Sequence, residues 1–63
     1  MAYRVYTLEG QIKLYVMAFS SVTGLMLTSE KDMAWNTKSM SIARRVNDAV
    51  KKNFKINSNI QSE

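Results

Sequence analysis

The stretch Gln11–Ser20, QIKLYVMAFS, constrains the fold of this chain more than any other segment. Apolar residues take every second position from Ile12 to Ala18, and the interleaved positions are also apolar after Lys13. A period of two with β-branched and aromatic side chains is typical of a β-strand, and apolar character on both faces indicates a central strand. We therefore expect the rest of the chain to add a strand on each side and a layer over one face.

A first strand is predicted at Tyr3–Leu8, joined to the central strand by the two-residue turn Glu9-Gly10. Glycine readily adopts the positive φ that such hairpin turns require. Leu8 then faces Gln11, and a slip of one residue would mix the apolar and polar faces, so the pattern favours this register. The predicted pairs on the more apolar face are Thr7 with Ile12, Val5 with Leu14, and Tyr3 with Val16.

A third, short strand is predicted at Gly24–Thr28, after a turn over residues 20–23 that is rich in serine and threonine. If Phe19 faces Gly24, the leucines of this strand fall on the face that the first hairpin already makes apolar. Two independent turns that give one apolar face predict a three-stranded antiparallel meander. The predicted pairs are Ala18 with Leu25 and Val16 with Leu27.

The second half of the chain predicts one helix. Ser39 is a good N-cap for a helix that runs to about Lys55. Before it, Ser29 is expected to cap a single helical turn, and the segment 34–37 is expected to be extended with Trp35 turned inward. The tail, residues 57–63, has one isoleucine among polar residues and is expected to fray. The apolar arc of the helix comprises Ile42, Ala43, Val46, Ala49, Val50, Asn53 and Phe54.

The predicted fold class is therefore α+β: a three-stranded antiparallel β-meander with one C-terminal α-helix packed on one face. A single domain is expected over residues 1–56, followed by the frayed tail at 57–63. With 63 residues the chain has no room for a second domain, and folds this small often gain stability from disulfides, a metal or self-association.

The composition argues against most catalytic chemistry. The chain has no cysteine and no histidine, and only five carboxylates, none of which the predicted elements bring together as a pair. We therefore expect no catalytic residues, no metal, no cofactor and no small-molecule substrate. No apolar run reaches the length of about 20 residues that spans a bilayer, and the N-terminus lacks a signal-peptide pattern. These features predict a cytoplasmic protein without a membrane partner.

One face of the predicted sheet is left without cover from the chain's single helix. Basic and aromatic side chains on an open sheet can stack bases and neutralise phosphates, while exposed aromatics with methionine and arginine also describe protein interfaces. A third interpretation is a solvated face on which basic stems cover the rings. The expected partner-binding residues on this face are Arg4, Tyr6, Lys13, Tyr15, Met17 and Phe19.

The outer side of the predicted helix is basic. A solvated amphipathic helix accounts for this pattern, and contact with phosphates or with an acidic protein is the alternative. The residues of this second candidate surface are Arg44, Arg45, Lys51, Lys52 and Lys55.

The segment from Gly24 to Trp35, GLMLTSEKDMAW, followed by Ser39 and Ala43, resembles a pattern in small proteins of phages and prophages of Gram-positive bacteria. In that pattern a glycine, an apolar pair and a TS-acid-K sequence precede AW, and a serine-started helix follows. This chain has Thr37 where the pattern has an aromatic residue. The resemblance covers about a third of the chain and implies a protein that binds and inhibits a host protein, in the host cytoplasm. No functional residue is carried over from it.

The sequence thus predicts a small non-enzymatic, phage-type protein that binds a host protein, as an inhibitor of a host function or defence. A small basic nucleic-acid-binding module is one alternative. A self-associating structural protein, with a homodimer as its assembly, is the other.

Overall fold

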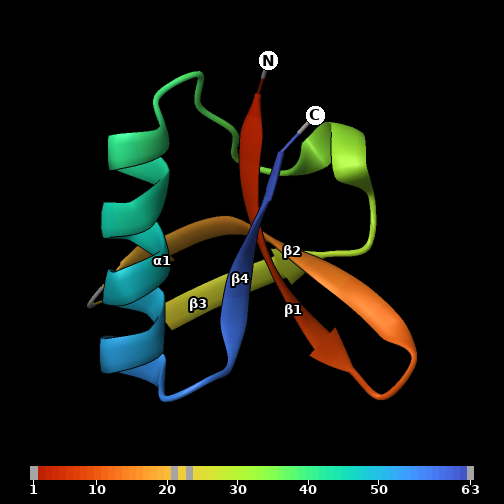
Figure 1. Ribbon diagram of the computed structural model, residues 1–63. Coiled ribbons are helices and arrows are strands. Elements are labelled where there is room, and N and C mark those ends of the chain that lie inside the picture. Colours follow the sequence, from red (N-terminus) through yellow and green to blue (C-terminus); the bar gives the residue numbers. More distant parts are fainter. Residues whose placement is uncertain (1, 21, 23, 63) are drawn as a thin grey trace.

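A four-stranded antiparallel sheet forms the frame of the molecule, and a single helix packs on one of its faces (Figure 1). The computed structural model describes residues 2–20, 22 and 24–62. The sheet has the order β3-β2-β1-β4, which confirms the α+β class and the central position of β2, but the sheet has one strand more than predicted. The elements are β1 (Tyr3–Glu9), β2 (Ile12–Ser20), β3 (Gly24–Thr28), the 3₁₀ turn η1 (Lys31–Met33), α1 (Met40–Phe54) and β4 (Ser58–Ser62).

The hairpin between β1 and β2 turns one residue later than predicted. Glu9 pairs with Ile12, so Gly10 and Gln11 form the two-residue loop, and Gly10 has a φ of +63° at its first position. A positive φ at the first loop position and not at the second is the geometry of a type II′ turn. The predicted register is therefore wrong by two residues. Because the side-chain period is also two, the side chains of β1 and those of β2 up to Val16 keep their predicted faces.

A β-bulge in β2 changes which side chains reach the core. Val16 pairs with Leu27 as predicted, but Ala18 pairs with Met26, so Met17 is an extra residue on β2. Beyond a bulge the alternation of side chains is inverted. Phe19 therefore pairs with Leu25 and packs on the helix side of the sheet, where its ring meets that of Phe54 edge to face at 6.3 Å. The predicted pairs of Phe19 with Gly24 and Ala18 with Leu25 are wrong, and of the predicted turn, Ser21 and Thr23 lie outside the described residues.

The segment predicted as a frayed tail is the edge strand β4, so the single domain extends past residue 56 to at least Ser62. It pairs antiparallel with β1 along its whole length. Ser58 is 1% exposed, and its Oγ donates a hydrogen bond to Asn47 Oδ1 of α1 at 2.6 Å. The Thr7 hydroxyl donates to the Asn57 carbonyl at 2.9 Å. Backbone pairing and these polar contacts hold β4. Because Ile60 is its one apolar residue, the strand has no apolar alternation from which it could have been predicted.

The connection from β3 to α1 crosses to the side of the sheet away from α1, where η1 lies (Figure 1). The side chain of Ser29 caps no helix, since η1 begins after Glu30 and has no side-chain cap. The chain then returns in extended form: Trp35 N donates to the Val16 carbonyl at 3.0 Å, and Thr37 exchanges two backbone bonds with Tyr3. The predicted extended segment is thus present, as an isolated bridge rather than a strand.

Helix α1 begins as predicted, with the Ser39 Oγ accepting a hydrogen bond from Ile42 N, and ends at Lys55, which has the left-handed φ of 54°. The core lies between α1 and the sheet, and α1 packs mainly over β1 and β4. The predicted arc of the helix is too wide, because Ile42 is 46% exposed and Asn53 is also exposed. The side chains buried at the centre of the core are Val5, Val16 and Val50, surrounded by Phe19, Leu25, Leu27, Trp35, Val46, Phe54 and Ile56.

Candidate functional site

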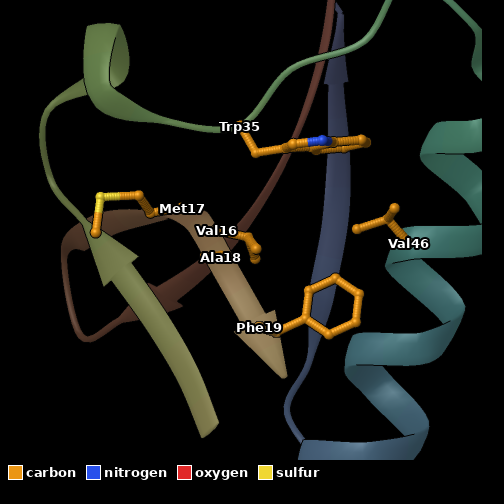
Figure 2. A pocket seen from close by; sticks show the side chains of 6 residues that line it. All are labelled: Val16, Met17, Ala18, Phe19, Trp35 and Val46. Atoms are coloured by element: carbon orange, nitrogen blue, oxygen red, sulfur yellow. The ribbon is translucent and has the colours of Figure 1, made fainter. Parts of the chain in front are cut away.

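An apolar hollow lies on the helix side of the sheet, beside α1, where the helix does not cover the end of β2. It has a volume of about 250 Å³ and only apolar lining residues. Trp35, Phe19 and Val46 face one another across it, from the returning segment, β2 and α1, while the Met17 side chain points away from α1 (Figure 2). The backbone of Trp35 is hydrogen-bonded to β2, and its indole forms one wall of the hollow. The lining residues are Val16, Met17, Ala18, Phe19, Trp35 and Val46.

A second hollow of about 450 Å³ continues along the helix toward its C-terminus. It is lined by Phe19, Ser20, Gly24, Asn53 and Phe54. Phe19 borders both hollows, which adjoin each other between α1 and the ends of β2 and β3, and we name the pair the α1–β2 groove. The β-bulge at Met17 creates this groove, because without it Phe19 would point to the opposite face of the sheet.

One flank of α1 borders the groove. Val46 lines the first hollow and Asn53 the second, seven residues further along the helix. Ile42 and Ala49 lie on the same flank, because residues three and four apart are neighbours on a helix surface. Asn47 faces the other way and binds Ser58 of β4. The apolar flank of α1 is thus half-covered by the sheet and half-open to the groove.

The positive charge of the protein is concentrated on α1. Residues 40–55 contain five cations and one carboxylate, Asp48, while the rest of the chain contains four cations and four carboxylates. The helix and its C-cap therefore carry the whole net charge of +4. All five cations predicted as a basic helix face are exposed: Arg44, Arg45, Lys51, Lys52 and Lys55. The structure brings them together on one element, beside the groove.

The sheet face predicted to bind a partner is less open than expected. Tyr15 is 8% exposed, and the segment around η1 lies on this side of the sheet (Figure 1). Phe19 belongs to the opposite, helix side, so its assignment to this face is wrong. Met17 is the bulged residue and is half-buried, and Arg4 is half-buried too.

Two of the predicted residues on this face are engaged with each other. Lys13 Nζ lies 4.6 Å from the centre of the Tyr6 ring, a cation–π contact, and donates a hydrogen bond to Gln61 Oε1 at 2.7 Å. The lysine thus reaches from β2 across β1 to β4 and covers the tyrosine ring. With Tyr6 covered and Tyr15 buried, this face offers no open pair of rings on which bases can stack.

Sequence reasoning missed the groove, although its residues were singled out. Trp35 was predicted to turn inward, and it does, but as a wall of a hollow beside the core. Ile42 and Asn53 were assigned to the apolar arc of the helix, although both are exposed. The width of that arc was the signal that its edge residues would not all be buried. The predicted arc contains seven residues. Since α1 packs mainly over β1 and β4, the sheet cannot bury all seven.

Among the described residues, no cluster of three or more acidic, cysteine or histidine side chains is placed to hold a metal ion. Over the same part of the chain, no helix is long and apolar enough to cross a membrane. Comparison with protein-family models, with curated proteins and with solved structures gave no match.

Proposed function

We propose that this chain is a small non-enzymatic protein whose function is to bind another protein through the α1–β2 groove. The proposal depends on the groove itself: two adjoining hollows that share Phe19, the first lined only by apolar residues and walled by Trp35, and both left uncovered by α1. Aromatic residues and methionine are enriched in protein interfaces, and apolar pockets near their centre bind the anchoring side chains of a partner.

The open residues around the groove support a macromolecular partner over a small ligand. Ile42 is 46% exposed on the helix flank. The groove extends over two turns of α1, from Val46 to Asn53, and so presents a long surface rather than one enclosed cavity. A partner protein that covers it also removes the exposed apolar flank of α1 from water, which is favourable in proportion to the area buried.

The resemblance of residues 24–43 to small phage and prophage proteins supports a bacterial host protein as the partner. On this proposal the protein acts in the host cytoplasm and inhibits a host function or defence by occupying a surface of its target. The resemblance includes Trp35 of the groove, but it assigns no role to that residue.

Site-specific photo-crosslinking tests the proposal. A photoreactive amino acid replaces Ile42 at the groove, and in a control protein it replaces Leu8, which is 59% exposed at the β1–β2 hairpin. In a lysate of a Gram-positive host treated with nuclease, the protein labelled at position 42 should form a discrete adduct with a host protein, and the protein labelled at 8 should not. Adducts of equal yield from both positions, or none from position 42, would refute the groove as the binding site.

Nucleic-acid binding is a second candidate, supported by the concentration of the net charge on α1. Phosphate contacts by Arg44, Arg45, Lys51 and Lys52 predict an affinity that falls with salt, with a log–log slope of several units. Fluorescence anisotropy with labelled duplex and single-stranded DNA and RNA at low salt decides this point. Absence of binding in all cases excludes this candidate.

Self-association is the third candidate, and a homodimer is its simplest form. Light scattering at high micromolar concentration tests it. A monomeric mass over the whole range excludes the homodimer.

A further inference from the structure

The open flank of α1 has the spacing of a coiled-coil seam. The residues Ile42, Val46, Ala49 and Asn53 are separated by four, three and four positions. This is the alternation of a and d positions in a heptad, with Val46 and Asn53 at a and the other two at d. A second helix laid along this flank can place its own a and d side chains against them and into the two hollows of the groove.

The positions beside this seam differ in what they expose. Ala43 and Val50 take the e positions and are buried against the sheet. Arg45 and Lys52 take the g positions, and both are exposed. In coiled coils the residues at e and g form the interhelical ion pairs that select the partner. The one open margin of the seam is therefore cationic, and it selects a partner helix that carries carboxylates there.

The α1 residues that line the two hollows are one heptad apart. Val46 and Asn53 line one hollow each and are seven residues apart, which corresponds to about 10.5 Å along the helix axis at 1.5 Å per residue. A helix lying alongside α1 repeats its a positions at the same interval. Phe19, between the hollows, then contacts the intermediate d side chain of the partner.

A second copy of this chain is a poor occupant. Its α1 and the C-cap Lys55 together carry five cations and one carboxylate, so two such helices side by side repel each other. The apolar side of that helix is also already committed to its own sheet through Ala43 and Val50.

We infer that the α1–β2 groove binds an acidic amphipathic α-helix of the partner protein, with apolar side chains in the two hollows and carboxylates against Arg45 and Lys52. This inference rests on the proposed function and specifies the chemistry of the partner. It differs from phosphate binding, which would use the cations of the helix without regard to their position relative to the groove.

Synthetic peptides provide the probe. One peptide of about 20 residues, long enough to form a helix, has leucine at a and d and glutamate at e and g. Two control peptides have lysine in place of those glutamates, or the acidic composition in scrambled order. None contains tryptophan, so the emission of Trp35, the chain's single tryptophan, reports contact at the groove. The acidic amphipathic peptide should shift and saturate this emission with an affinity at least about tenfold higher than either control.

Two matched double variants locate the contact. R45E/K52E reverses the charges at the g positions, and R44E/K51E makes the same two changes at the f positions, which face away from the seam. Both pairs are seven residues apart and exposed, so both variants should keep the melting temperature and circular dichroism of the parent within a small margin. The first should weaken binding of the acidic peptide by about tenfold or more, and the second by much less.

Equal loss in both variants, equal affinity for the scrambled peptide, or no saturable change up to about 1 mM peptide overturns the inference. These results are distinguishable from failure of the proposed function, which the crosslink at position 42 tests. If that crosslink captures a host protein while the acidic peptide fails to bind, the groove is still a protein-binding site and the acidic helix is not its ligand.

Discussion

Val50 lies at the centre of the contact between α1 and the sheet, and its truncation gives the most quantitative test of the fold. It is 0% exposed and packs with Val5 and Val16. Val50→Ala removes two buried methyl groups, which costs about 1.6 kcal/mol of transfer free energy at about 0.8 kcal/mol each. The cavity that remains raises the expected loss in unfolding free energy to about 2–3 kcal/mol.

This loss is large for a protein of 63 residues, whose total unfolding free energy should be about 3–9 kcal/mol. At about 4–8 °C for each kcal/mol in a domain of this size, the melting temperature should fall by about 10–20 °C. Thermal and urea unfolding followed by circular dichroism measures both quantities. Val22→Ala is the matched control. Because Val22 is 91% exposed, this variant should have the melting temperature of the parent protein. If Val50→Ala also melts with the parent, α1 does not pack on the sheet as described.

Three further substitutions test other features of the fold. Tyr15→Glu places a charge at a position that is 8% exposed, which should cost about 3 kcal/mol or more of unfolding free energy. In a domain of this size that loss lowers the melting temperature by well over 10 °C. An unchanged melting temperature would show that this sheet face is open. Ser58→Ala removes the hydrogen bond to Asn47, and unfolding in urea should show a loss of about 1–2 kcal/mol, whereas no loss would mean that β4 is not held by this contact. Gly10→Ala forces a side chain into a φ of +63° and should cost about 1 kcal/mol by the same assay, and a stabilised variant would contradict the turn geometry.

The sequence was sufficient to predict the elements whose signal is local. The alternation in β2 up to Val16 and the capping serine of α1 are set by neighbouring residues, and these features lie where they were expected, whereas the first hairpin turns one residue later than predicted. The faces of β1 and of β2 up to Val16 were also correct despite a register error of two residues, because a shift by two leaves each side chain on the same face of the sheet.

The features that the sequence did not predict depend on contacts between distant segments. β4 is a polar edge strand, held by pairing with β1 and by a bond from Ser58 to Asn47, and neither contact leaves a periodic pattern. The bulge at Met17 arises where β2 pairs with β3 and where Trp35 binds the Val16 carbonyl. The prediction assumed strict alternation of side chains along β2, and it therefore placed Phe19 on the wrong face of the sheet.

The candidate site was predicted only in its components. The cations of α1 were assigned correctly to an exposed face, since charge on one side of a helix follows directly from its period. The apolar groove beside them was not predicted, because it depends on the inversion of Phe19 at the bulge and on where α1 lies over the sheet. The predicted binding face lost Phe19 to the core and has Tyr15 buried.

The central claim is that the α1–β2 groove is the protein-binding surface, and its most direct test is a map of the contact by nuclear magnetic resonance. Methyl and backbone signals are recorded before and after addition of the host protein captured by crosslinking. The largest shifts should occur at Ile42, Val46 and Asn53 of α1, together with the Trp35 indole, while Leu8 and Lys13 on the opposite face stay unchanged. Shifts that are concentrated around Tyr6 and Lys13, with the groove signals unmoved, would contradict it.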